Sequence, residues 1–441
     1  MIKAGLVSLI LYFLISPFSF ADKTEQIDYE TITLRLYYEQ KWDSLLMIGE
    51  EAISKDYDYF FMRTRVGRAA FEKQLYIKAA KHFEKALEFN ENDAFSIEYL
   101  YYSYRYSGRE AEARFLLSQL PDYLSRPLGK PDRMPVLYIE TGPAFTNHLS
   151  TYDKKHQKPP GSYSEVYLNR NSQYLLAGIV QPVNYRIRIN AAAALLNFNK
   201  ERIVNITGLD SLSGDYSVKQ WEAYFSPTLN LNKKLSISPA FRLIGISHEN
   251  PLQSEDTIVQ KLIGPQGMKS YNDYAAGGEI AYSTPYLTYS IGAWMIHVDN
   301  TDNTQLSGNI FARPLGNLNF YTSTTISLNS FKDTTRFLVN QMIGGRVYKK
   351  LWGEAFFTWG DLSNTGEQNI QVVYNAFEKI KYRAGTRLIL NVNNYLKISL
   401  RYQIFFKEGT ELFYPDASKF RIFSYNYQSH SITGGITWNL H

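Results

Sequence analysis

The chain contains no cysteine among its 441 residues. Disulfide bonds, thiolate zinc sites, thiol nucleophiles and a lipidated N-terminal cysteine are therefore excluded. This absence is compatible with an oxidising compartment such as the periplasm. Beyond its first residues the chain also lacks any run of 18 or more apolar residues, so no later segment predicts a membrane-spanning helix.

Strong charge of either sign is missing as well. The formal net charge is +5, and no basic block is longer than a few residues, which excludes the basic surface typical of nucleic-acid-binding proteins. The seven histidines show no metal-ligand spacing, and no G-x-S-x-G or H-E-x-x-H motif occurs. His297 with Asp299, or His248 with Glu249, could serve an outer-membrane enzyme, but no serine accompanies either pair in a recognisable motif. We therefore expect no enzyme, no catalytic residue, no cofactor and no metal.

The first 21 residues have the pattern of a secretory signal peptide. Lys3 supplies a positive charge, an apolar run follows from Leu6 to Ile15, and Ser19-Phe20-Ala21 forms a small-x-small cleavage site. The mature chain would begin at Asp22. The alternative is an uncleaved anchor, for which the apolar run is short.

Aromatic residues are abundant, with 35 Tyr and 26 Phe against 7 Met, while the mean hydropathy is −0.31. This combination suits a membrane β-barrel, in which alternate residues face water and aromatic girdles mark the interfaces. The hydrophobic period changes along the chain: residues 22–130 predict helices, and residues 135–441 predict strands. The expected fold class is α+β multidomain.

The helical part repeats every 34 residues. The spacing of Gly67, Ala79, Phe83 and Ala86 matches the small and aromatic positions of a tetratricopeptide repeat. A shift of 34 residues aligns small or apolar residues in two columns, and turn residues precede each second helix. The columns are Leu45, Ala79 and Ala113, then Ala52, Ala86 and Leu120, and the turn residues are Gln40, Gln74 and Gly108. Tetratricopeptide-like hairpins are expected; the alternative is an unrelated helical bundle. Pro121, Pro127, Pro131 and Pro135 mark the boundary.

The second part alternates apolar and polar residues in about fourteen segments, with an uncertainty of two. They are 136–147, 163–181, 185–197, 216–231, 235–247, 271–283, 286–297, 302–313, 318–328, 334–348, 351–360, 381–391, 395–406 and 428–440. Every even-numbered connection is short, whereas the odd-numbered ones include the long stretches 148–162, 198–215, 248–270, 361–380 and 407–427. A soluble sandwich would also alternate, but tight turns on one side and long loops on the other are typical of an outer-membrane barrel.

Charged residues within these strands are expected to point into the barrel, because a charge facing lipid costs about 2–4 kcal/mol at the midplane. A basic-lined passage favouring anionic material is one interpretation. The other is a lumen braced by Arg–Glu pairs with Glu222, Glu279 and Glu354, without an open path. The expected lumen-facing basic residues are Arg186, Arg188, Arg242, Arg346, Arg383, Arg387, Lys397 and Arg401.

Two further surfaces could meet a partner. Repeat arrays bind peptides or proteins on a concave face, which Arg63, Arg65, Tyr101, Tyr102 and Arg105 could line; alternatively the tyrosines pack between the repeats. The stretch from Asp361 to Lys381 is the best external loop; it is a variable surface, or it folds inward or meets a ligand.

A signal peptide, tetratricopeptide helices and a C-terminal barrel form a layout that resembles the surface lipoprotein assembly modifier family of Gram-negative bacteria. It is also similar to exopolysaccharide exporters with periplasmic repeats. The resemblance implies an outer-membrane location, a periplasmic helical domain, and export or surface assembly of a protein or polysaccharide client. The alternatives are a non-conducting, membrane-anchored adaptor and an outer-membrane enzyme. An open lumen would favour transport, and a plugged lumen would favour the adaptor.

Overall fold

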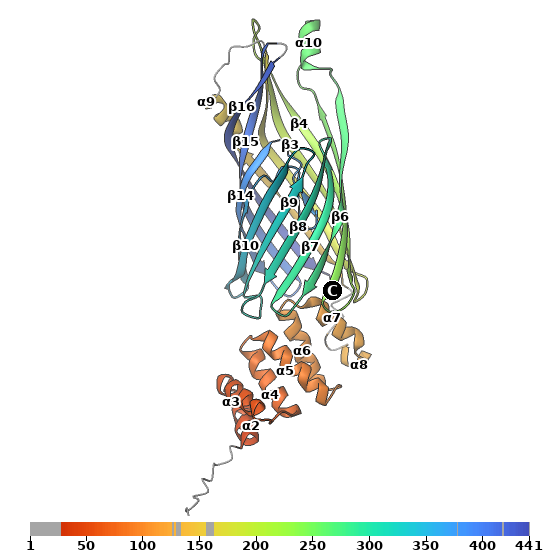
Figure 1. Ribbon diagram of the computed structural model, residues 1–441, viewed down its shortest axis with the longest axis vertical. Coiled ribbons are helices and arrows are strands. Elements are labelled where there is room, and N and C mark those ends of the chain that lie inside the picture. The colour runs from red at the N-terminus through yellow and green to blue at the C-terminus, as the bar shows by residue number, and fades with distance from the viewer. Residues whose placement is uncertain are drawn as a thin grey trace, which may run out of the picture.

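The computed structural model describes residues 28–125, 128, 134–155, 163–376, 378–416 and 419–440. The expected signal peptide lies outside the described residues. Within them, none of the helices has both the length and the apolar character required to cross a bilayer. Figure 1 shows a helical region at one end of a tall β-barrel.

The helical region consists of three successive helix pairs and a short final helix. The N-terminal ends of α2 and α6 are capped by Asp28 and Asp93, whose carboxylates accept backbone hydrogen bonds at 3.0 and 2.7 Å. The helices are α2 Tyr29–Tyr38, α3 Trp42–Ser54, α4 Phe60–Glu72, α5 Tyr76–Phe89, α6 Ala94–Tyr106, α7 Glu110–Gln119 and α8 Asp122–Ser125.

The 34-residue period of the sequence is also a period of the backbone. Gln40, Gln74 and Gly108 all have positive φ, at 54°, 59° and 75°, and each lies in the turn between the two helices of a pair. The aligned column of Leu45, Ala79 and Ala113 is fully buried at every position. Each helix pair therefore packs on the next in an equivalent way.

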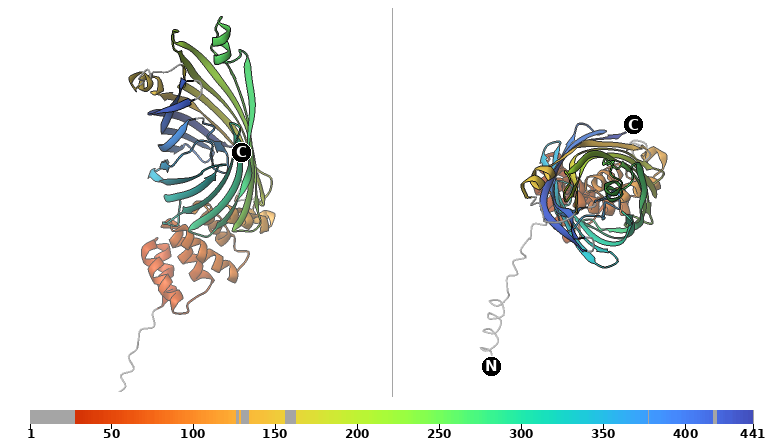
Figure 2. Two further views of the ribbon diagram at one scale, coloured as in Figure 1. Left: turned by 45° about the horizontal axis from the view of Figure 1, so that its top comes forward. Right: turned by 90° about the horizontal axis from the view of Figure 1, so that it is seen from above.

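Fourteen antiparallel strands close into a barrel, as the sequence predicts. Figure 2 shows the closed ring along the barrel axis. The strands are β1 Val136–Thr146, β2 Tyr163–Pro182, β3 Ile187–Ile206, β4 Leu212–Asn230, β5 Leu235–Glu249, β6 Met268–Ser283, β7 Leu287–Val298, β8 Thr301–Ala312, β9 Phe320–Ser330, β10 Thr335–Tyr348, β11 Leu351–Trp359, β14 Lys379–Asn391, β15 Leu396–Asp416 and β16 Lys419–Asn439. β1 pairs with both β2 and β16, so the ring has no free edge.

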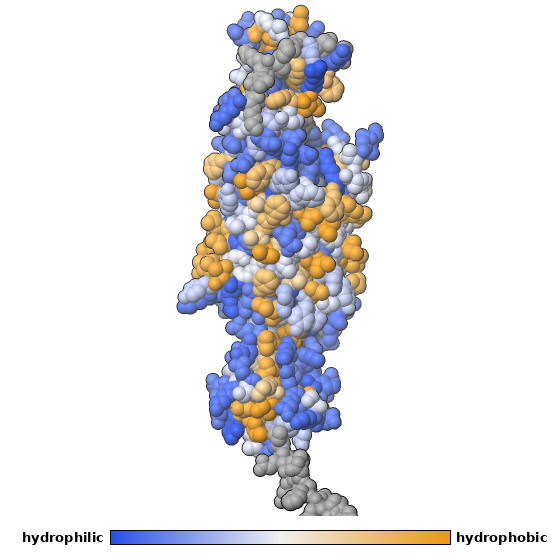
Figure 3. Space-filling view, turned by 60° about the vertical axis from the view of Figure 1, so that its left-hand side comes forward, coloured by the Kyte–Doolittle hydropathy of each residue, from blue (hydrophilic) through white to orange (hydrophobic). Residues whose placement is uncertain are grey.

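The two ends of the barrel differ. The short turns lie at one end together with the helical region, and we call it the helical end. The long connections lie at the other end, the loop end, which carries two short helices, α9 His148–Lys155 and α10 Thr257–Ile263. Between the ends, apolar side chains form a band on the outside of the barrel (Figure 3). Outward residues such as Ile291 and Ile432 belong to it.

Two of the expected long loops are not loops. β3 continues to Ile206 and β4 begins at Leu212, so strands occupy most of the first stretch. β15 likewise continues to Asp416, and β16 begins at Lys419. The stretches 198–215 and 407–427 were thus wrongly assigned as loops. The strict outward apolar alternation weakens there although strand pairing continues, because strands outside a membrane need no continuous apolar face.

The helical region is attached to the barrel through its turns. The backbone carbonyl of Gln74 accepts a 3.0 Å bond from Asn317, and the carbonyl of Gly108 accepts a 3.2 Å bond from Arg313. The side-chain oxygen of Gln74 also accepts a 2.8 Å bond from Arg346. Two turns one repeat apart therefore meet the barrel at its helical end.

Candidate functional site: the lumen loop and the cavity beside it

The connection between β11 and β14 folds into the barrel. We call residues 361–378 the lumen loop, of which Phe377 lies outside the described part. It contains a small hairpin of β12 Gly366–Glu367 and β13 Val372–Val373. Of the two alternatives left open by the sequence, an external surface and an inward fold, the structure shows the inward fold.

The lumen loop spans the full width of the barrel. The backbone of Gly366 exchanges two hydrogen bonds of 2.7 and 2.8 Å with the side chain of Gln305 on β8. Gln371 donates a 2.9 Å bond to the hydroxyl of Tyr138 on β1. β1 and β8 are seven strands apart in a ring of fourteen, so they stand on opposite sides. The loop is thus fixed at both ends of a diameter.

Further bonds fix the middle of the loop. The Asn369 side chain accepts a 2.9 Å bond from the indole of Trp294 and donates to Ser226 and the Ser238 carbonyl at 3.2 and 3.0 Å. Beneath these bonds Ile370 is 1% exposed and packs with Trp294 and wall residues of β4, β5 and β7. An apolar contact and a polar network therefore hold the same segment.

An arginine on the wall holds the hairpin. The Arg383 guanidinium donates to both carboxylate oxygens of Glu367, at 2.7 and 2.9 Å, and to Thr358 at 2.8 Å. It also contacts the hydroxyl of Tyr374 and lies over the ring of Phe356. A bidentate, charge-assisted pair of this kind is among the stronger polar contacts in proteins.

A buried cluster secures the exit of the loop at Glu378. Its carboxylate accepts a 2.5 Å bond from Asn169 and a short bond from Tyr427. His148, at the start of α9, stacks on Tyr427 with ring centroids 3.8 Å apart and is fully buried. Burial lowers the pKa of His148 to about 3, so it is neutral.

Four of the eight expected lumen arginines and lysines have carboxylate partners inside the barrel. Arg383 pairs with Glu367 as described, and Arg242 forms a close pair with Glu222. Arg401 bonds Glu140 at 2.5 Å, and Arg387 lies 3.8 Å from Glu140 and 4.0 Å from Glu354. This pairing matches the braced-wall interpretation at the level of the loop.

The other four lie towards the helical end. Arg346 reaches Gln74, and Arg188 and Lys397 are within electrostatic range of Glu110 on α7. Arg186 is exposed in the turn before β3, with its guanidinium over the ring of Tyr185. The expectation that Arg186 faces the lumen was wrong, because β3 begins only at Ile187 and Arg186 is not part of the strand.

The expected partner surface on the helices is not a continuous face. Tyr101 is 1% exposed and Arg65 is 8% exposed, so both pack inside the helical region and cannot present a surface to a partner. Arg63 pairs with Asp58 at 2.6 Å, and Arg105 reaches Glu110 at 3.1 Å. Tyr102 is partly buried and stacks on the ring of Tyr106.

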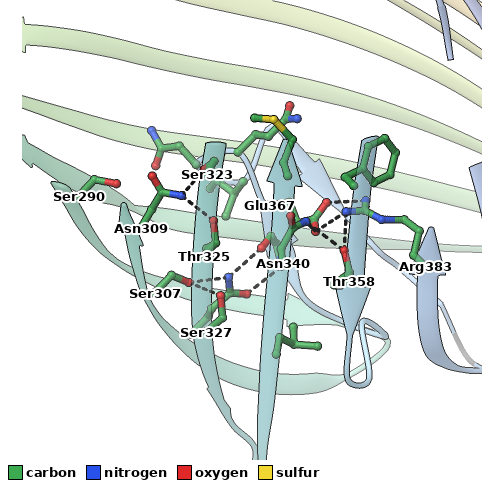
Figure 4. A pocket seen from close by; sticks show the side chains of 18 of the residues that line it. Ser290, Ser307, Asn309, Ser323, Thr325, Ser327, Asn340, Thr358, Glu367 and Arg383 are labelled. Atoms are coloured by element: carbon green, nitrogen blue, oxygen red, sulfur yellow. Dashed lines mark hydrogen bonds and ion pairs between the residues drawn. The ribbon is translucent and has the colours of Figure 1, made fainter. Parts of the chain in front are cut away.

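A cavity of about 410 Å³ adjoins the lumen loop, whose residues 366–370 form one of its sides. From the loop it extends towards the helical end, where Glu354, Arg387 and Met342 line it. Figure 4 shows that hydroxyl and amide side chains dominate the wall. The labelled residues are Ser290, Ser307, Asn309, Ser323, Thr325, Ser327, Asn340, Thr358, Glu367 and Arg383.

The uncharged part of this wall was missed at the sequence level, where only charged residues were assigned to the lumen. The signal was present, because Ser323, Thr325 and Ser327 alternate with the outward Ile326 and Leu328. Within the described residues, no group of three or more histidine or acidic side chains is arranged to hold a metal ion.

A closed barrel with an apolar outer band is the architecture of outer-membrane β-barrel proteins, since closure satisfies every strand hydrogen bond away from water. No protein-family model and no curated protein sequence matches the chain. The toluene transporter TodX of P. putida is similar to it at 8% identity and a TM-score of 0.44, over 74% of this chain and 92% of TodX.

Two other solved structures show comparable similarity. A FadL homologue of Pseudomonas aeruginosa has 7% identity and a TM-score of 0.44, over 70% of this chain and 91% of its own. The translocator domain of the autotransporter NalP from Neisseria meningitidis has 10% identity and a TM-score of 0.31, over 77% and 99%. Because these identities and TM-scores are low, the assignment to outer-membrane β-barrel proteins rests on the architecture of this barrel alone.

Proposed function

We propose that the protein is an outer-membrane passage that is closed at rest by its lumen loop and opens to export or surface-assemble a polar client. The observation that carries this proposal is the loop that spans a barrel diameter, bonded to Gln305 on one side and Tyr138 on the other. A segment so placed obstructs the lumen while it stays bound.

The way the loop is attached supports a gate. Its entry and exit are adjacent, because the backbone N–H of Leu362 bonds the carbonyl of Ile380 at 3.0 Å. Displacing the loop therefore breaks no pairing between barrel strands. Water can replace its neutral hydrogen bonds, each of which contributes about 0.5–1.5 kcal/mol net, whereas the charged pair of Glu367 with Arg383 contributes about 1.5–3 kcal/mol for each bond.

The helical region is proposed to lie in the periplasm and to dock the client or a partner protein. It sits at the helical end of the lumen, attached through Gln74 and Gly108. Its period of 34 residues and its fully buried column of Leu45, Ala79 and Ala113 support a tetratricopeptide-like array. Such arrays bind peptides and proteins.

The second candidate is a non-conducting anchor for the helices. The lumen loop favours it, since a plugged lumen is what a non-conducting anchor requires. The pairing of Arg242, Arg383 and Arg401 with carboxylates favours it as well, because ion pairs of this kind can brace a wall permanently. An enzymatic role is not proposed.

Single-channel conductance in planar bilayers separates the two candidates. The wild-type chain is compared with a variant in which residues 363–378 are replaced by a short Gly-Asn turn, joining β11 to β14 directly. We expect the wild type to be silent and the variant to conduct steadily. Both are also measured without residues 22–130, so that the helices cannot mask an open lumen.

A control variant shortens the connection that holds α10, which stands at the loop end beyond the barrel wall (Figure 1). It should be as silent as the wild type. Silence of the loop-replaced barrel, with and without its helices, would reject the passage and leave the anchor.

A further inference from the structure

The cavity beside the lumen loop has a wall without charge. On β8 and β9 the lining side chains are hydroxyls and amides alone: Gln305, Ser307, Asn309, Ser323, Thr325 and Ser327. Five of them are short, the sixth, Gln305, is held by its bonds to Gly366, and all stand on paired strands, so little freedom is lost when they bind a ligand. The cavity volume, about 410 Å³, falls in the range of small-molecule sites, roughly 300–1,000 Å³.

Three of these side chains form a fixed array. The Asn309 amide nitrogen donates to the hydroxyls of Ser323 and Thr325, at 2.7 Å each. Both hydroxyls therefore accept one bond and keep their own O–H to donate. Among the described residues neither hydroxyl donates that proton to an acceptor, and the Asn309 side-chain oxygen accepts no side-chain bond. The array offers two donors and one acceptor to the cavity.

Aromatic rings stand beside the polar wall. Trp294 lines the cavity with its indole N–H already bonded to Asn369, so its orientation is fixed. Phe356 on β11 also lines the cavity, under the guanidinium of Arg383. A ligand that fits must therefore combine many hydrogen-bonding groups with an apolar face.

The arginines around the cavity have acidic partners. Arg383, Arg387 and Arg401 line it together with Glu279, Glu354 and Glu367. The arginines are engaged by carboxylates at 2.5–4.0 Å, with Glu140 as an additional partner. Glu279 accepts a 3.0 Å bond from Ser290 and forms no ion pair with a basic side chain among the described residues. No positive charge is therefore left over to select an anionic ligand.

We propose that this cavity binds a segment of a neutral saccharide. A pyranose ring carries several hydroxyls, each both donor and acceptor, and a face of C–H groups that packs on an aromatic ring. The array of Asn309, Ser323 and Thr325 meets the hydroxyls, and Trp294 meets the C–H face. The proposal rests on the proposed function in one respect, since passage through the barrel is what brings the saccharide to the cavity.

The test is equilibrium binding to the full-length protein in an amine-oxide detergent, which has no sugar headgroup. Saturation-transfer NMR is used to titrate maltotetraose, cellotetraose and chitotetraose, with tetraglycine and tetragalacturonate as comparison ligands. The variant is Ser323→Ala with Thr325→Val. The control is Thr324→Val, the adjacent threonine of β9, which faces outward and bonds Gln341.

We expect saturable binding of at least one neutral tetrasaccharide, weakened about tenfold or more in the double variant and changed less than about twofold in the control. Absence of saturable binding for all three, equal loss in both variants, or preference for tetraglycine or tetragalacturonate would overturn the proposal. Binding is measured at equilibrium in the closed protein, so it is independent of conductance. A binding protein that never conducts would reject the passage alone, and a conducting variant whose cavity binds no saccharide would reject the site alone.

Discussion

At the scale of single residues, several buried charges of this protein lie against a charge of opposite sign. Arg242 and Glu222 are 4% and 5% exposed and lie against each other in the lumen. A buried charge without a partner would cost several kcal/mol, so removing either residue of the pair would leave the other in an unfavourable position. In the helical region Arg63 pairs with Asp58 at 2.6 Å and also contacts a histidine.

His82 on α5 is 5% exposed, and its Nδ1 accepts a 3.2 Å bond from Arg63. Burial, and then the Arg63 charge, lower the pKa of His82 from 6.5 to about 4, although Glu50 lies 3.8 Å away. Between these pH values the unfolded chain binds a proton that the folded chain does not. The helical region should therefore lose stability as the pH falls through this window, by about 2 kcal/mol at pH 5 relative to pH 7.

Urea unfolding of the full-length protein, followed at 222 nm where helices dominate, measures this loss. His82→Gln removes the titrating group and should reduce the difference between pH 7 and pH 5, even if the variant is less stable at both. An unchanged difference in His82→Gln would assign the pH dependence to other groups.

At the scale of elements, the strands are longer than the membrane requires. β16 has 21 residues, whereas its partner β1 has 11. About 9–11 tilted residues cross a bilayer, so the first half of β16 stands beyond the apolar band. Ile432 pairs within the part shared with β1 and β15, whereas Ile422 pairs with the extension of β15 alone.

This difference predicts the effect of a lysine at either position. Both isoleucines are exposed on the outer face, at 44% and 58%. Ile432→Lys should destabilise the barrel in lipid vesicles by about 2–4 kcal/mol, and Ile422→Lys by less than about 1 kcal/mol. Urea titration of folding into large unilamellar vesicles compares the two. Equal destabilisation would mean that the membrane covers the extension as well.

At the scale of the whole molecule, the helices and the barrel are joined where backbone turns with positive φ meet barrel turns. A Cβ added to Gly108 would lie 3.1 Å from Leu318 and 3.3 Å from Arg313. Gly208, in the turn after β3, has a similar φ of 85° with nothing within 4 Å. Comparing an alanine substitution at Gly108 with one at Gly208 therefore distinguishes the effect of backbone strain from the effect of contact with the barrel.

Gly108→Ala should loosen the joint, because it adds a crowded contact to a backbone strain of about 1–2 kcal/mol. We expect faster amide hydrogen exchange in residues 313–319 of this variant, measured by mass spectrometry. Gly208→Ala carries the strain alone and should leave exchange in that turn unchanged. If Gly108→Ala also leaves it unchanged, the joint does not depend on this turn.

Much of the barrel was predictable, but its interior was not. Alternation and the positions of short turns gave all fourteen strands, and lipid excludes charge from one face, so the inward direction of Arg242 and Arg383 followed as well. The partner of Arg383 did not follow, because Glu367 reaches Arg383 from a loop rather than from a neighbouring strand position. Pairing across a lumen leaves no periodic signal.

The sequence by itself determined the helical pairs, the strand count and the outward face, because each depends on a local period or on the exclusion of charge from lipid. Only the tertiary structure decided that residues 361–378 turn inward, since Gly366 and Gln371 find their partners on opposite strands of the closed ring. It also placed Tyr101 and Arg65 inside the helical region, where packing between repeats decides exposure. Local pattern fixes which face of an element is polar, whereas the assembled wall decides what that polar face meets.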